Sequence, residues 1–389
     1  MAIRALSFDR AELAGAVADL GVLVPIAVAL IVNNELSATA VLLPAGLLYL
    51  AAGFIYRLPV PVQPLKAFGA IAISHGLGSS EIAAGALLMG AMFIILGASG
   101  LLDRAAKVFP LPIIRGVQLS VGLLFCQLAW NLATAPPTAF TDHSRSTAWL
   151  MAGAATVAMA AWLFRRKNAS LVLIALAIVS MGWTFHGPLL WGPAALHIPI
   201  LSIQTFATAA IVLVLPQLPL TFANSCLATA DVAHTYFGAA AERVTPGRLA
   251  LSLGVANLLA GAVSGMPICH GAGGMTAHRG FGARTGGAPI VMGLVLLIIS
   301  VIMGASLAAV LAGFPLPILA GLLTVAGFLH MALLRDLHQP VHVILAIAVG
   351  VTGFLLNLAV ALVGALLFWW ITKAIMGWRD RRHTPGTGI

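Results

Sequence analysis

The chain consists mainly of long apolar stretches that are separated by short breaks rich in polar residues, proline or glycine. A helix needs about 20 mainly apolar residues to cross the hydrocarbon core of a bilayer. Read in this way, the pattern predicts fourteen helical segments in two sets of seven. The first set is expected at 10–33, 37–56, 67–78, 81–102, 111–131, 146–164 and 169–185. The second set is expected at 203–222, 248–265, 272–280, 288–311, 315–334, 341–355 and 357–376.

The third and tenth segments are too short to span a membrane, and each follows an irregular stretch, residues 57–66 (RLPVPVQPLK) and 264–274 (SGMPICHGAGG). A break at the same place in each set of seven predicts two repeats of opposite orientation, because seven is odd. The repeats would be residues 1–200 and 201–377, followed by a short basic cytoplasmic tail at 378–389. The alternative is that both breaks are ordinary loops, although irregular backbone at membrane depth needs protein or water around it.

Composition and charge support a membrane protein. Of the residues, 61% are hydrophobic and 8% are charged, whereas a soluble domain carries about 25% charged residues. This excludes a soluble enzyme, a nucleic-acid-binding domain and a disordered chain. If the N-terminus is cytoplasmic, 18 of the 20 Lys and Arg residues face the cytoplasm, with Arg145 outside and Lys66 within a short helix. The positive-inside rule then predicts a multi-pass protein of the plasma (inner) membrane with both termini cytoplasmic.

Motifs of catalysis are missing from the sequence. The pair Cys269-His270 is too small for a metal site, and residues 271–274 (GAGG) lack the βαβ unit of a dinucleotide site. We therefore expect no enzyme activity, no metal and no cofactor. Histidines near the ends of predicted segments are expected at the membrane interface: His75, His186, His197, His330 and His338.

The two short helices predict an anion site. A helix N-terminus presents unpaired N–H groups and about half a positive charge, so two such ends facing each other at the midplane would hold a small anion. Glycine at 271, 273 and 274 permits close approach of the backbone. Proline at 61, 64 and 267 keeps a helix from continuing through each break.

Charged and polar residues add to this site. Lys66 lies in the first turn of a short helix, where it either adds positive charge for an anion or pairs with Asp19 of the first segment. Asp19 is then either a coupling carboxylate or a structural one. Neutral donors come from Gln63, Gln217, Thr221 and Asn224. Pro216 and Pro219 are expected to loosen the eighth segment and expose its backbone.

Several motifs resemble the sulfate-permease (SulP) superfamily. Residues 257–267 (NLLAGAVSGMP), 281–286 (FGARTG) and 110–116 (PLPIIRG) carry this resemblance. The chain resembles the molybdate-transporter branch of this superfamily more closely. The motifs that carry this closer resemblance are residues 59–66 (PVPVQPLK), 216–225 (PQLPLTFANS) and 269–274 (CHGAGG). The resemblance extends over essentially the whole chain. The STAS domain of most sulfate permeases is missing, which also favours the molybdate branch.

The resemblance implies an all-α 7+7 inverted-repeat fold like that of uracil and bicarbonate transporters. Helices 1–4 and 8–11 would form a core domain, and helices 5–7 and 12–14 a gate domain. Substrate would lie between the third and tenth helices. Sulfate permeases commonly carry Ser-Arg where this chain has Gly273-Gly274, so Lys66 would supply the cation. Further donors would be Gln63, Asn224 and the backbone of His270, Gly271, Ala272, Gly273 and Gly274.

Together these observations predict a secondary transporter of a tetrahedral oxyanion, with molybdate preferred over sulfate as the substrate. H⁺ or Na⁺ is the possible coupling ion, and a homodimer formed through the gate is possible because related folds form one. The alternatives are a carrier of sulfate, bicarbonate or another anion, an anion channel, and a lipid-modifying enzyme that uses Cys269 and His270.

Overall fold

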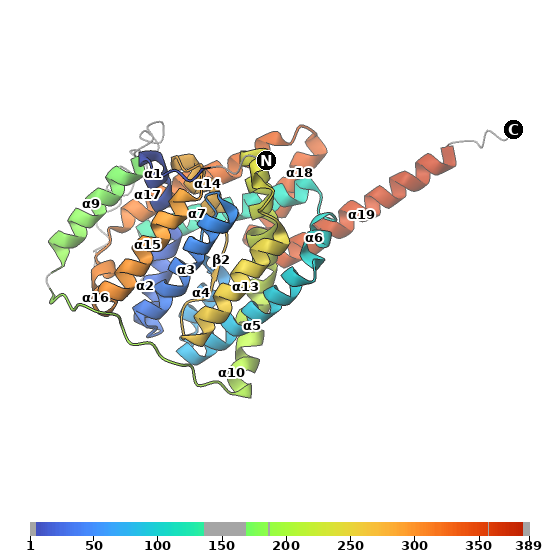
Figure 1. The fold of residues 1–389 in the computed structure, drawn as a ribbon. Coiled ribbons are helices and arrows are strands. Elements are labelled where there is room, and N and C mark those ends of the chain that lie inside the picture. Colours follow the sequence, from blue (N-terminus) through green and yellow to red (C-terminus); the bar gives the residue numbers. More distant parts are fainter. Residues whose placement is uncertain (1–4, 136–168, 186, 357, 384–389) are drawn as a thin grey trace.

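The computed structural model describes residues 5–135, 169–185, 187–356 and 358–383, and these residues are mainly helical (Figure 1). The segment predicted at 146–164 lies outside the described residues, as do Arg145, His186 and the end of the chain from residue 384. Seven described helices are long and apolar enough to span a membrane, or eight if the bent pair α15–α16 is counted as one span. The chain is therefore a multi-span membrane protein, and the count of fourteen segments stays a prediction.

Apart from the segment predicted at 146–164, the first half of the chain contains the predicted helices, with three short additions (η1, β1 and α6). The elements are α1 (Arg10–Ala16), η1 (Val17–Asp19), α2 (Leu20–Asn33), α3 (Ala38–Tyr56), β1 (Gln63–Pro64), α4 (Lys66–Ser74), α5 (Ser79–Ala98), α6 (Leu101–Ala106), α7 (Leu111–Thr134) and α9 (Ala169–Thr184). The span that includes η1 is one apolar helix from Arg10 to Asn33 with a 3₁₀ turn inside it. The helix predicted at 81–102 ends early, because Gly100 adopts a left-handed conformation (φ 65°) between α5 and α6.

The second half is more irregular. Its elements are α10 (Ile203–Thr208), η2 (Ala209–Val214), α11 (Leu215–Leu220), η3 (Thr221–Ala228), α12 (Thr229–Phe237), η4 (Gly238–Ala241), α13 (Pro246–Ala262), β2 (Ile268–Cys269), α14 (Ala272–Phe281), α15 (Gly287–Ile302), α16 (Gly304–Ala312), α17 (Leu316–Met331), η5 (Ala332–Asp336), α18 (Pro340–Leu355) and α19 (Leu358–His383).

Three predicted segments in this half differ from the structure. The segment predicted at 203–222 continues to Ala241 as 39 helical residues, because neighbouring helices bury its polar stretch around Asn224. The segment predicted at 288–311 is bent by 110° between α15 and α16. Helix α19 runs on to His383, so the first residues of the predicted tail are helical.

Prolines reshape the eighth segment without ending it. Pro216 and Pro219 lie in α11, and π-helical turns precede it (η2) and follow it (η3). Each proline lacks an N–H and leaves one carbonyl of the preceding turn without its helical donor. Widened π turns frequently mark functional sites. The predicted loosening is therefore present as a change of helix type.

Helices from the first half of the chain pack against helices from the second half. Helix α3, from the first half, packs along α15, and α13, from the second half, packs along α5. Glycines face each other at these crossings: a Cβ on Gly90 would lie 2.9 Å from the Gly254 carbonyl oxygen. Small residues allow such close approach of membrane helices. A second group, in which α7 packs with α17 and α18, contacts α14 and α2.

Candidate functional site

The two breaks meet in the middle of the fold. Strands β1 and β2 pair antiparallel, with Gln63 opposite Cys269 and Pro64 opposite Ile268. The Leu65 N–H also donates to the Pro267 carbonyl at 3.1 Å. Helices α4 and α14 start directly after these strands, so their N-termini are adjacent and the helices run in opposite directions. The breaks are therefore one structural unit and not two ordinary loops.

Buried side chains hold this unit together. Asn257 of α13 donates to the Ile268 carbonyl at 2.6 Å and accepts from the Ile268 N–H at 2.9 Å. His270 has no exposed surface, and its Nδ1 donates to the Pro61 carbonyl at 2.9 Å. Its Nε2 lies 2.8 Å from Ser252 Oγ. Both ring nitrogens of His270 are thus occupied, and its imidazole joins the two breaks.

Gln63 connects the two charged residues that the sequence singled out. Its Nε2 donates to the Asp19 carboxylate, and its Oε1 accepts from Lys66 Nζ at 2.7 Å. Asp19 is 2% exposed, whereas Lys66 is half-buried. The described residues contain no direct Asp19–Lys66 ion pair. Lys66 is therefore held by a neutral amide, and its ammonium has further N–H groups for another partner.

The residues predicted on the eighth segment divide into two roles. Gln217 Oε1 accepts from the Phe68 N–H at 2.9 Å, and its Nε2 donates to Thr221 Oγ1 at 2.8 Å. Gln217 thus caps the first turn of α4, and Thr221 supports Gln217. Asn224 is 2% exposed, and its side-chain oxygen has no hydrogen-bond partner among the described residues. The Asn224 amide points towards Gly271, because a Cβ there would lie 3.7 Å from Nδ2.

Two of the glycines at the start of α14 face Gln63, and the third faces Phe125. A Cβ on Gly271 would collide with the Gln63 side chain, and one on Gly274 would lie 2.5 Å from Gln63 Nε2 and 2.8 Å from Asp19 Oδ2. A Cβ on Gly273 would lie 2.7 Å from Cε2 of Phe125. Phe125 belongs to α7, and Lys66 Nζ lies 5.6 Å from its ring centroid. The sequence analysis missed Phe125, whose apolar side chain carried no signal.

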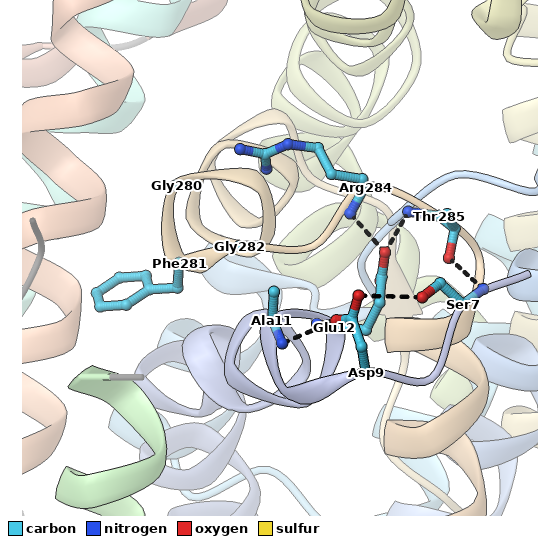
Figure 2. A pocket seen from close by; sticks show the side chains of 9 residues that line it. All are labelled: Ser7, Asp9, Ala11, Glu12, Gly280, Phe281, Gly282, Arg284 and Thr285. Atoms are coloured by element: carbon cyan, nitrogen blue, oxygen red, sulfur yellow. Dashed lines mark hydrogen bonds between the residues drawn. The ribbon is translucent and has the colours of Figure 1, made fainter. Parts of the chain in front are cut away.

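The helix N-termini differ in what occupies them. At the edge of a surface pocket of about 270 Å³, the Glu12 carboxylate accepts from the N–H groups of Arg284 and Thr285, each at 2.8 Å (Figure 2). It also accepts from Ala288 at 3.2 Å, so α15 begins on the protein's own anion. Helix α14 has no side-chain cap at Gly271 among the described residues. Its first-turn N–H groups, at Ala272, Gly273 and Gly274, are thus left for another acceptor.

A second charged cluster connects α7 to α12 and η5. Arg115 of α7 is 1% exposed and forms ion pairs with Asp231 of α12 and Asp336 of η5. Gln118 Nε2 also donates to Asp231 at 2.9 Å. The charge count placed Arg115 among the cations that face the cytoplasm, yet it is buried with two carboxylates and connects α7 to α12 and η5. Its position in the 110–116 motif was the available signal.

The prediction that His330 lies at the membrane interface is wrong. This residue of α17 has no exposed surface, and its Nδ1 lies 2.9 Å from Thr276 Oγ1 of α14. A histidine near a helix end can still be buried when another helix covers that end. His75 is exposed, as expected for an interface.

Comparison with known sequences gives consistent relatives. A family described as "Molybdate transporter of MFS superfamily" matches residues 11–125 and 209–329. "Molybdate transporter 2" of Arabidopsis thaliana is 30% identical over 393 residues, covering 88% of this chain and 83% of the relative. "Molybdate transporter 1" of the same plant is 28% identical and covers 84% and 80%.

Solved structures show the same fold at low identity. The transmembrane domain of the cyanobacterial bicarbonate transporter BicA is similar with a TM-score of 0.57 and 18% identity, covering 91% of this chain and 96% of that one. The murine anion transporter Slc26a9, in an inward-facing state, is similar with a TM-score of 0.66 and 14% identity, covering 96% and 69%. The fold is thus that of SulP/SLC26 transporters, as the resemblance implied. The family match covers more than half of the chain, and a relative that is 30% identical covers 88% of it. The chain therefore belongs to the molybdate transporter family.

Proposed function

We propose that this protein is a secondary transporter that carries molybdate across the plasma (inner) membrane and binds it as a dianion between the N-termini of α4 and α14. The observation that carries the proposal is the uncapped start of α14 next to Lys66. The names of the relatives support molybdate as the substrate, and the anion-transporting structural neighbours share the fold.

The described geometry suggests a role for each residue. The N–H groups of Ala272, Gly273 and Gly274 donate to the oxyanion, as N–H groups do at other helix N-termini that bind anions. Lys66 adds a charged donor, and the buried Asn224 amide adds a neutral one. Gln63 orients Lys66, while Gln217 and Thr221 hold α4 in place.

Charge balance suggests how transport is coupled. Two helix N-termini supply about +1 together, and Lys66 brings the total near +2, which matches a dianion. An ionised Asp19 would remove one positive charge from this balance. We therefore infer that Asp19 is neutralised when the substrate binds, with H⁺ favoured over Na⁺ because its carboxylate is buried against the Gln63 amide.

The packing of Phe125 on Gly273 suggests the moving contact. Gly273 lies in α14 with the two breaks, whereas Phe125 lies in α7, which packs with α17 and α18. Movement of the group that carries the breaks past α7 would open the site to one side and then the other. Such a movement must separate the Phe125 ring from Gly273.

Uptake by reconstituted vesicles tests the proposal. Labelled molybdate uptake is measured with sulfate as competitor, under an imposed pH gradient and, separately, a Na⁺ gradient. We expect molybdate to be preferred and the pH gradient to drive accumulation. Equal uptake with no gradient dependence and no saturation would indicate a channel. Stronger competition by sulfate than by unlabelled molybdate would reassign the substrate.

Variants of Lys66 and Asp19 test the site residues. Lys66→Ala should weaken molybdate affinity, measured by isothermal titration, far more than the matched Lys66→Arg, which keeps the charge. Asp19→Asn should keep molybdate exchange but lose accumulation driven by the pH gradient. If Asp19→Asn accumulates molybdate as the parent does, Asp19 is structural. If Lys66→Ala binds with parental affinity, the cation lies elsewhere.

We also propose a membrane topology and an oligomeric state for this transporter. Both termini are expected in the cytoplasm, with residue 145, which lies outside the described residues, on the other side. Labelling of a single cysteine at 145 from the cytoplasmic side alone would contradict this orientation. A homodimer formed through the gate helices is tested by light scattering of the purified protein.

A further inference from the structure

An apolar groove lies along the outer side of α3 and α13. The two helices are antiparallel neighbours, since a Cβ on Gly265, just after α13, would meet the backbone of Ala40 at the start of α3 (Figure 1). The groove has a volume of about 570 Å³. Its floor includes the buried Pro44, Leu48 and Ala256. Its exposed walls include Leu47, Ile55, Val255 and Leu259, each between 41% and 51% exposed.

The dimensions of the groove fit a hydrocarbon chain. Its α3 wall runs from Pro44 to Tyr56, which is roughly 18 Å at 1.5 Å per residue. Helix α3 is one of the membrane-spanning helices, so the groove opens towards the hydrocarbon of the bilayer. A cavity of this volume lies within the usual range for small-ligand sites.

One end of the groove is cationic. Arg248 lines it and is exposed, and Arg243 NH1 lies 3.5 Å from the Ile55 carbonyl at the same end. Neither arginine forms an ion pair within the described part of the chain. Basic residues at the membrane surface attract anionic lipid headgroups. The groove thus combines an apolar channel with a cation at one mouth.

Polar groups at this end connect the groove to the breaks. Tyr56 and Ser252 both line it, and their hydroxyls lie 2.7 Å apart. Ser252 Oγ lies 2.8 Å from His270 Nε2, and His270 donates in turn to the Pro61 carbonyl. An occupant of the groove would therefore touch the side chains that position the two breaks.

We propose that this groove binds an anionic phospholipid, with one acyl chain between α3 and α13 and the headgroup phosphate on Arg248. Charge complementarity selects an anionic lipid over a neutral one, and the apolar walls select a lipid over a soluble phosphate. The site is separate from the molybdate site, so the proposal stands or falls independently of the transported substrate.

Native mass spectrometry of the purified full chain tests the proposal. Phosphatidylglycerol and phosphatidylcholine with identical acyl chains are titrated, and the dissociation constant of each is measured. We expect phosphatidylglycerol to bind more tightly.

Arg248→Gln should weaken phosphatidylglycerol binding about fivefold, since one basic residue contributes about 1 kcal/mol. It should leave phosphatidylcholine binding unchanged. Arg248→Lys should restore it. The matched control Arg104→Gln, at an exposed position on α6 outside the groove, should match the parent.

A second variant tests the apolar part. Val255→Trp fills the groove and should weaken binding of both lipids, whereas Val301→Trp, at a similarly exposed position outside it, should not. The thermal midpoint of the parent should rise with phosphatidylglycerol, and that of Val255→Trp should rise less. Equal affinity for the two lipids with no effect of Arg248→Gln overturns the proposal. The proposal is also overturned if the parent forms a dimer without added lipid and Val255→Trp does not, because a second copy of the chain would then cover the groove.

Discussion

Replacement of Gly273 by alanine is expected to act on the contact between the two helix groups. The added Cβ would lie 2.7 Å from Cε2 and 2.8 Å from Cζ of Phe125. Carbon atoms in contact prefer 3.5–4.0 Å, so the ring would have to retreat by about 1 Å. Phe125 is 1% exposed and its Cβ is close to Gly327 of α17, which leaves it little room.

The expected magnitude follows from the overpacking, which costs about 1–3 kcal/mol. This cost applies only while Phe125 lies on Gly273. Alanine in place of glycine within a helix also returns up to about 1 kcal/mol, but this gain is the same in both arrangements and cancels from their ratio. The population of the arrangement with Phe125 on Gly273 should therefore fall by about fivefold to 150-fold relative to one in which the groups have separated.

The populations are measured as distances between spin labels at exposed positions on α3 (Phe54) and α7 (Trp130). Gly273→Ala should shift the distribution, and Phe125→Leu should suppress the shift. Gly274→Ala is the matched control. Its added Cβ meets Gln63 and Asp19 and not the Phe125 ring. Phe125→Leu should therefore not change the distance distribution of Gly274→Ala. An unchanged distribution in Gly273→Ala, or the same shift with and without Phe125→Leu, would refute this account.

Three further substitutions test other contacts by thermal unfolding in detergent. Arg115→Gln leaves two carboxylates without their cation and should cost about 3–5 kcal/mol, so an effect as small as that of the exposed control Arg104→Gln would contradict the buried link. His270→Phe leaves the Pro61 carbonyl unsatisfied and should cost about 1–3 kcal/mol, with His270→Gln less damaging; equal effects would show that packing alone matters. Glu12→Gln weakens charge-assisted bonds to three N–H groups and should cost about 1–2 kcal/mol, and a variant as stable as the parent would show that the neutral amide caps α15 equally well.

The short helices could be predicted because their signals are local. An apolar stretch of the wrong length and a run of prolines or glycines determine where a membrane helix stops, and both are visible within about ten residues. The starts of α4 and α14 lie within one residue of the predictions, at Lys66 and Ala272. Where the local signal was ambiguous the boundaries were wrong, as in the polar stretch around Asn224 that is helical because other helices bury it.

The partners of the polar side chains could not be predicted, because they come from residues distant in sequence. Gln217 was read as a donor to substrate, yet it caps Phe68, 149 residues away. Arg115 was counted only as a cation that faces the cytoplasm, yet Asp231 and Asp336 approach it in the folded chain. The sequence alone thus determined the membrane class and the two breaks, because apolar length and backbone restrictions act locally. Only the tertiary structure decided which polar groups bind each other and which have no partner among the described residues, because a hydrogen bond depends on the positions of both partners.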